Sequence, residues 1–114
     1  MRRRVGLLLV CLAAAAPAAA HPGPYYWSMP TVMRKIDGSR VTIGRWHHRI
    51  DAAATLCSGD GRPVVRSGVR RWKHFTCTET TFSASKGVDR DITFRVHVVS
   101  RRRFLITNAH FGSF

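Results

Sequence analysis

The fold is decided by the stretch from Leu56 to Thr78, which begins Leu56-Cys-Ser-Gly-Asp-Gly61 and ends Trp72-Lys-His-Phe-Thr-Cys-Thr78. Its two ends carry Cys57 and Cys77, and the third cysteine, Cys11, lies in an N-terminal segment that we expect to be removed. Two remaining cysteines allow one pairing, so the sequence predicts a Cys57–Cys77 disulfide. Closing a loop of about 20 residues should stabilise a small domain by roughly 3 kcal/mol.

The first 20 residues have the three parts of a secretory signal peptide. Three arginines follow Met1, a mostly apolar run extends from Val5 to Ala16, and Ala18-Ala-Ala20 completes the pattern, which predicts cleavage after Ala20. The apolar run is much shorter than the roughly 20 residues that cross a bilayer, so we expect no membrane span in the mature chain. We therefore expect a secreted, extracytoplasmic bacterial protein, because disulfides persist in that environment.

The remaining segment, residues 21–114, has the length of one small domain and is strongly basic. It holds 16 of the 19 Lys and Arg residues and all six acidic residues, which gives a formal charge of +10. Such an excess is typical of surfaces that bind anionic polymers, including nucleic acid and cell-envelope polymers. Over the whole chain arginine outnumbers lysine sixteen to three, however, and GC-rich coding DNA produces the same bias without any function. We weigh the two explanations equally.

Hydrophobic periodicity predicts one helix over residues 29–36. Ser28 suits the N-cap, Pro30 fits the first turn, and Asp37-Gly38 ends the segment. One apolar stripe recurs at helical spacing and consists of Met29, Val32, Met33 and Ile36. We expect this stripe to face the core.

From Arg40 onward the pattern alternates, as strands do. The expected strands are 41–43 with 46–50 as one hairpin, 52–57, 63–65 with 69–82 as a second hairpin, 91–100, and 104–111. Segment 83–90 is polar and predicts a connection. In strand 91–100, Ile92, Phe94, Val96 and Val98 face one way and Thr93, Arg95, His97 and Val99 the other.

These elements predict a single α+β domain over residues 21–114. We expect one N-terminal amphipathic helix packed on a curved antiparallel sheet of about five or six strands, because neither element is stable alone. A small β-barrel is the alternative. We expect the domain to be a monomer.

Several motifs resemble a group of small exported actinobacterial proteins. They are Trp27-Ser-Met-Pro30, Leu56-Cys-Ser-Gly-Asp-Gly61, Arg70-Arg-Trp-Lys-His-Phe-Thr-Cys77 and Phe94-Arg-Val-His-Val98. The similarity covers nearly all of residues 21–114, and the motifs around the two cysteines are its most specific part. The resemblance implies export, one disulfide and a fold of one helix and a sheet. It implies no catalytic residues.

The six histidines do not have the spacing of a metal site. The chain contains no His-x-x-x-His or Cys-x-x-Cys motif, and a disulfide removes two thiols from metal binding. A zinc site of His74, His97 and a carboxylate would require that their strands be neighbours. We favour structural or surface histidines, and we expect neither a metal nor another cofactor.

Two functions of different kinds are compatible with the pattern. In the first, Phe75 and Cys77 face the core, and the opposite face of the sheet presents Trp72, His74, Arg95 and His97. An aromatic side chain among cations is how proteins hold single-stranded nucleic acids, so this set predicts a binding surface for an anionic polymer. The competing interpretation is that Trp72 covers an edge of the core, or that the helix lies on this same face of the sheet.

The second function is a small secreted phosphodiester hydrolase similar to a ribonuclease. Such an enzyme needs a carboxylate base, a histidine acid and cations that hold phosphate. Glu79 is the only glutamate in the chain, and His97 and His110 could act with it. Glu79 is equally well explained as an outward or edge residue beside Lys73 or Arg70. We favour a non-enzymatic binding or envelope-associated module.

Overall fold

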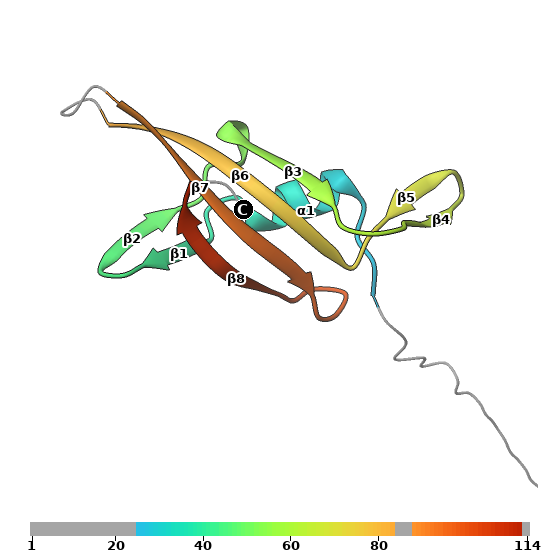
Figure 1. Cartoon of the computed structure of the whole chain (residues 1–114). Coiled ribbons are helices and arrows are strands. Elements are labelled where there is room, and N and C mark those ends of the chain that lie inside the picture. Colours follow the sequence, from blue (N-terminus) through green and yellow to red (C-terminus); the bar gives the residue numbers. More distant parts are fainter. Residues whose placement is uncertain (1–24, 84–87, 113–114) are drawn as a thin grey trace, which may run out of the picture.

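The computed structural model describes residues 25–83 and 88–112, which form mostly antiparallel strands with one α-helix (Figure 1). The main sheet has the strand order β3-β6-β7-β8. Its strands are β3 (Thr55–Gly59), β6 (His74–Ser83), β7 (Val88–Val98) and β8 (Phe104–Phe111). Two separate hairpins consist of β1 (Arg40–Ile43) with β2 (Trp46–Arg49) and β4 (Val64–Arg66) with β5 (Val69–Arg71). The predicted signal peptide, residues 1–20, lies outside the described residues.

The helix α1 spans Met29–Ile36, as its apolar stripe predicts. Val32 and Ile36 are fully buried, and Met29 and Met33 pack against the same core. The helix begins at residue 29, so it is the first element of the described fold but does not lie at the N-terminus of the sequence. Ser28 occupies the N-cap, but its hydroxyl bonds to the Thr31 hydroxyl (3.1 Å) instead of capping a backbone N–H. No helix in the described part of the chain is long and apolar enough to cross a membrane.

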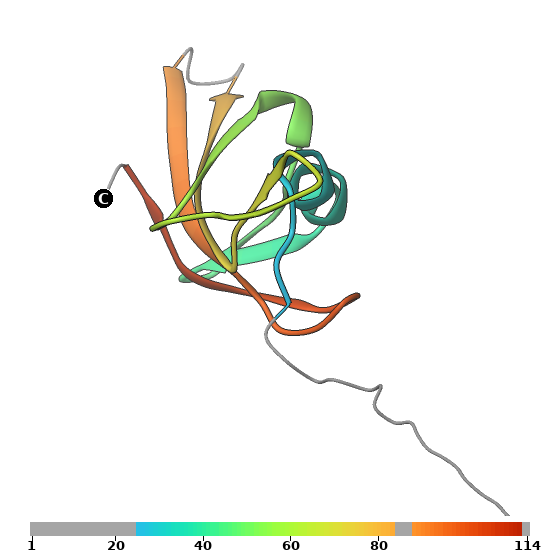
Figure 2. The ribbon, with the colours of Figure 1, turned by 90° about the vertical axis from the view of Figure 1, so that its right-hand side faces the viewer.

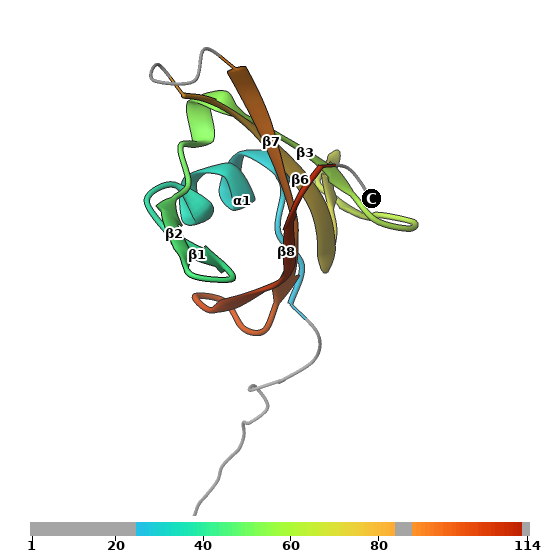
Figure 3. The same cartoon turned by 60° about the vertical axis from the view of Figure 1, so that its left-hand side comes forward.

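The main sheet curves around α1, and the β1–β2 hairpin lies on the remaining side (Figures 2 and 3). The core fills the space between α1 and the concave face of the sheet. Strand β7 contributes its inward set as the alternation predicts, because Ile92, Phe94, Val96 and Val98 are all buried. The described strands form three separate sheets and do not close into a barrel, so the β-barrel alternative was wrong.

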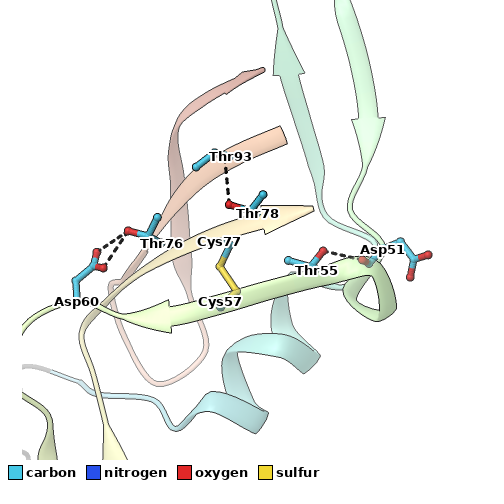
Figure 4. Close-up of a disulfide and its surroundings, with 8 residues drawn as sticks. All are labelled: Asp51, Thr55, Cys57, Asp60, Thr76, Cys77, Thr78 and Thr93. Atoms are coloured by element: carbon cyan, nitrogen blue, oxygen red, sulfur yellow. Dashed lines mark hydrogen bonds between the residues drawn. A yellow bond between two sulfur atoms is a disulfide. The ribbon is translucent and has the colours of Figure 1, made fainter. Parts of the chain in front are cut away.

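The predicted disulfide is present and joins the neighbouring strands β3 and β6 (Figure 4). Cys57 lies directly opposite Cys77 in the strand register, with their Cα atoms 4.0 Å apart. Cys77 is completely buried, and it shares the core face of β6 with Phe75. The crosslink therefore fixes the register of β3 on β6 from inside the core.

The prediction of five or six strands in one sheet was wrong, because the described residues form a four-stranded sheet and two hairpins. The expected long strand 69–82 is interrupted at Trp72, whose N–H and carbonyl bond to the carbonyl and N–H of Trp27 (both 2.8 Å). The start of expected strand 52–57 is a 3₁₀ turn, Ala52–Ala54, because the Asp51 carboxylate accepts the N–H of Ala53 (3.0 Å). The expected connection 83–90 is shorter, because β6 extends to Ser83 and β7 begins at Val88.

Replacing both cysteines, as Cys57→Ala with Cys77→Ala, should lower the free energy of unfolding by about 3 kcal/mol, because the loop between them becomes unconstrained in the unfolded chain. Urea denaturation of the oxidised protein and the double variant measures the difference. Reducing the wild-type protein before denaturation should give a loss of similar size. Equal midpoints for all three samples would contradict the stabilising role of the crosslink.

Candidate functional site

A pocket lies where the segment before α1 meets the C-terminal end of the helix and the turn between β7 and β8. Its volume is about 380 Å³. Aromatic and cationic side chains line it, and no acidic side chain does. The lining residues are Tyr25, Tyr26, Trp27, Thr31, Arg34, Lys35, Arg71, Arg101 and Arg102. We call this set the cationic aromatic pocket.

Trp27 is the fixed part of the pocket. Its side chain is only 4% exposed, and its ring meets Phe104 edge to face with centroids 5.7 Å apart. The two backbone hydrogen bonds to Trp72 hold its main chain in place. The Lys35 ammonium lies 5.8 Å from the centre of the Trp27 ring, within the range of a cation–π interaction. An aromatic surface with a cation over it is therefore built into the core.

The Trp72 ring packs directly against Gly59, where there is no side chain. A Cβ at Gly59 would overlap the Trp72 ring, so only glycine leaves room for the indole at this position. Gly59 lies opposite Phe75 in the register, and Trp72 meets Phe75 edge to face at 5.9 Å. Trp72 therefore packs on the core side of β3 and belongs structurally with Trp27.

The other three residues of the predicted binding surface lie together on the outer face of the sheet. His74 and His97 are directly paired across β6 and β7. Arg95 is paired with Thr76, two residues along each strand and therefore on the same face. The Nδ1 atoms of His74 and His97 are 2.7 Å apart, and Nε2 of His97 is 2.7 Å from the Thr107 hydroxyl on β8. The structure thus brings His74, Arg95 and His97 onto one face and places Trp72 elsewhere.

The electrostatics of this outer face favour an uncharged His97. Burial lowers the pKa of His97 below its ordinary value of 6.5, and the charges of His74 and Arg95 lower it further. Asp60 acts in the opposite direction, although its carboxylate is also held by the Thr76 hydroxyl at 2.9 Å (Figure 4).

Glu79 is buried, so the expectation of an outward or edge residue was wrong. Its side chain is 2% exposed and shares the core face of β6 with Cys77. Both carboxylate oxygens lie 3.0 Å from Nε2 of His48 on β2, and the N–H of Asp51 donates to one of them at 3.2 Å. A buried carboxylate requires such partners, because water cannot reach it. The pair attaches the β1–β2 hairpin to the main sheet.

The structure does not bring together the three residues of the hydrolase hypothesis. Glu79 faces the core, whereas His97 lies on the outer face of the sheet. Glu79 pairs with Ile92, five residues from His97 along β7, which is about 17 Å of extended chain. His110 lies on β8, where its Nδ1 atom is 2.7 Å from the carbonyl of Asn108. The histidine next to Glu79 is His48.

No three His, Cys, Asp or Glu side chains in residues 25–83 and 88–112 converge as a metal site would require. The strands that carry His74 and His97 are neighbours, but the carboxylate needed for the zinc site considered above is not close enough to join them. Comparisons of the chain with protein-family models, curated proteins and solved structures found no match. The site must therefore be interpreted from its own chemistry.

The cationic aromatic pocket could not be found from sequence spacing. Its residues come from four separate parts of the chain, and no spacing in the sequence links the Tyr25-Tyr-Trp27 run to the other three. The expected strands 91–100 and 104–111 leave the arginines at 101–103 as the connection between them, and this connection is where they lie. The available signal was the presence of an aromatic triplet and an arginine triplet, but only the fold places them together.

Replacing His48 by alanine should lower the free energy of unfolding by about 3 kcal/mol, because the buried Glu79 carboxylate loses its side-chain partner. His47→Ala is the matched control, since the exposed His47 bonds only the Thr42 hydroxyl among the described residues, and it should change stability by no more than about 0.5 kcal/mol. Urea denaturation compares the two. Equal losses would show that the buried pair does not hold the hairpin.

The pKa of His97, followed by NMR, should lie below 6.5. Arg95→Gln should raise it and Asp60→Asn should lower it further, because the two charges act in opposite directions. Because the pKa of His97 is lower in the folded protein than in the unfolded chain, the unfolded chain binds a proton to His97 more readily. Protonation of His97 should therefore destabilise the fold progressively as pH falls from 6.5 through the folded pKa. Shifts of the same sign in both variants would contradict this account.

Proposed function

We propose that this protein is an extracytoplasmic, non-enzymatic binding module that holds an anionic cell-envelope polymer in the cationic aromatic pocket. The observation that carries the proposal is the lining itself, in which five cations and three aromatic rings surround a space without any carboxylate. A volume of about 380 Å³ falls in the range of about 300–1,000 Å³ that is usual for ligand pockets.

The pocket cations are not neutralised within the described part of the chain. Among residues 25–83 and 88–112, the one contact between a basic and an acidic side chain within salt-bridge distance joins His48 to Glu79, and neither residue lines the pocket. Five positive charges that share a concave surface raise the local concentration of anions and bind them more strongly than scattered charges do. Three of the five cations are exposed arginines that a polymer can reach: Arg34 on α1, and Arg101 and Arg102 in the turn after β7.

The aromatic residues supply what charge alone lacks. Trp27 is held rigidly by its backbone pairing and by Phe104, and it forms a fixed and almost wholly buried floor beneath the pocket. Tyr25 and Tyr26 are half-buried and add two hydroxyl groups to the lining. A sugar or other ring of a polymer repeat packs on the tyrosine rings while its acidic group meets the cations.

The chemistry of the lining favours binding over catalysis. General acid–base catalysis at neutral pH needs a group that titrates in that range, most often histidine or a carboxylate. The pocket lining consists of arginine, lysine, tyrosine, tryptophan and threonine, and it contains neither a histidine nor a carboxylate. The disulfide supports an extracytoplasmic location, because such crosslinks persist in oxidising compartments.

Removing three pocket charges, as Arg71→Gln, Arg101→Gln and Arg102→Gln together, should weaken binding to a poly(glycerol phosphate) polymer about tenfold at 0.15 M salt. The matched control removes the same charge from exposed arginines outside the lining, as Arg45→Gln, Arg62→Gln and Arg66→Gln, and should have a much smaller effect. Titrations at several salt concentrations measure both affinity and the number of phosphate contacts.

The outcomes of this titration separate the alternatives. Equal weakening in the two triple variants would mean that diffuse charge, not the pocket, binds the polymer. Tighter binding of single-stranded DNA of matched charge, with the same dependence on the pocket arginines, would keep the pocket but replace the envelope polymer by nucleic acid. The fold of each variant is checked by its urea denaturation midpoint.

A further inference from the structure

The hairpin of β4 and β5 stands apart from the main sheet. It forms a two-stranded sheet of its own and extends from the end of the main sheet where β3 ends and β6 begins (Figure 1). Its turn is tight, because the two residues between the strands, Ser67 and Gly68, both have positive φ (51° and 76°). None of its three valines belongs to the hydrophobic core. We call this hairpin, residues 64–71, the β4–β5 arm.

Every pair of opposite residues in the arm joins a valine to an arginine. The pairs are Val64 with Arg71, Val65 with Arg70, and Val69 with Arg66. Directly opposite residues share a face of the sheet, so both faces of the arm carry both kinds of side chain. A hairpin that packs on a core has one apolar and one polar face. The arm lacks this division, and Val65 and Val69 are 60% and 39% exposed.

The positive charge of the arm is not neutralised by neighbouring acidic residues. Residues 61–78 contain four arginines and a lysine and no acidic residue. Asp60 precedes this segment, but its carboxylate accepts a hydrogen bond from the Thr76 hydroxyl on the main sheet (Figure 4). In the part of the chain that the structure describes, no acidic side chain lies within salt-bridge distance of the arm's arginines. The arm therefore presents free cations beside exposed apolar groups.

We propose that the β4–β5 arm binds the surface of a bilayer that contains anionic phospholipid. Guanidinium groups bind phosphate oxygens with two parallel hydrogen bonds, so the arginines meet the lipid headgroups. The valines beside them enter the boundary between the headgroups and the acyl chains, where apolar side chains of interfacial segments lie. Because each pair of residues combines the two kinds of side chain, either face of the arm can make these contacts.

The exposed valines favour a membrane over a soluble polyanion. The backbone of a nucleic acid or of a phosphate polymer is bound by cations and hydrogen-bond donors, and valine side chains supply neither. A second copy of this chain is a poor partner for the arm, because it would place the same unneutralised arginines opposite one another. A bilayer with anionic headgroups offers phosphates and an apolar layer at the same boundary.

The arm and the cationic aromatic pocket are neighbouring but separate surfaces. Arg71, at the base of the arm, also lines the pocket, whereas Val65, Arg66, Val69 and Arg70 do not. Substitutions at these four positions therefore test the arm and leave the lining of the pocket intact.

Sedimentation with vesicles at about 0.15 M salt tests the proposal. The vesicles contain phosphatidylglycerol and phosphatidylcholine in equal amounts, and pure phosphatidylcholine is the neutral reference, to which the protein should bind weakly. Arg66→Gln with Arg70→Gln should weaken binding to the anionic vesicles about 30-fold, because each basic residue near such a surface contributes about fivefold. Val65→Ser with Val69→Ser should weaken binding about tenfold at unchanged charge.

Matched controls make the same changes at exposed positions outside the arm. They are Arg40→Gln with Arg45→Gln, and Leu56→Ser with Leu105→Ser, and each should have a much smaller effect. A fluorophore attached after Ser67→Cys reports on the otherwise unchanged arm. Its emission should shift to the blue on anionic vesicles, because the tip of the arm enters a less polar environment.

Three results would overturn the proposal. The first is equal weakening by the arm and control variants, which would mean that diffuse charge binds the vesicles. The second is unchanged vesicle binding after Val65→Ser with Val69→Ser while Arg66→Gln with Arg70→Gln weakens binding to single-stranded DNA, which would assign the arm to a soluble polyanion. The third is a dimer in analytical ultracentrifugation that the valine substitutions dissociate, which would assign the valines to a second copy.

The membrane proposal and the polymer proposal can fail independently. The arm variants should bind poly(glycerol phosphate) as the unchanged protein does, because the pocket lining is intact. Loss of vesicle binding with polymer binding retained therefore supports the arm without bearing on the pocket. Equal urea denaturation midpoints show that the arm variants are folded, and the fluorophore experiment decides the proposal if one of them is not.

Discussion

The covalent link between Cys57 and Cys77 determines more of this structure than the two strands it joins. Because it places the two residues opposite each other, Gly59 comes to lie opposite Phe75 two positions further along β3. Gly59 is the position where the Trp72 ring needs an unoccupied surface. Trp72 then pairs with Trp27 through two backbone hydrogen bonds. The register fixed by the crosslink is therefore transmitted to the floor of the cationic aromatic pocket.

A second constraint comes from the buried carboxylate. Small domains bury a limited amount of apolar surface, so a charged side chain in the core must recover its lost hydration from hydrogen bonds. The Glu79 carboxylate forms hydrogen bonds with the His48 imidazole and the N–H of Asp51. These two residues are the ends of the segment 48–51, at the end of β2. The carboxylate accepts bonds only where this segment is correctly placed. It thus specifies where the hairpin docks, which apolar contacts alone do with less directional precision.

Sequence periodicity was a good guide wherever one face of an element is buried along its whole length. The apolar stripe of α1 and the alternation of β7 fall into this class, and both are confirmed by burial. Periodicity failed at Trp72, because an aromatic residue within an alternating run looks like a strand residue even when its backbone pairs with Trp27. It failed at Glu79 because the side chain that pairs with it, His48, is 31 residues away in the chain. Propensity rules assign a lone glutamate to the surface.

The same distinction separates the two explanations of the basic composition. A coding bias toward arginine acts on every position alike and gives no reason for cations to gather around aromatic rings. In this fold, five of the 19 Lys and Arg residues meet at one concavity that carries no acidic side chain, and two of them follow β7 in a turn where a small polar residue would serve the backbone equally well. Composition alone cannot distinguish bias from function, because it contains no positions. The gathering of charge around aromatic rings at one concavity is a positional feature, and the proposed binding function rests on this feature rather than on the overall charge.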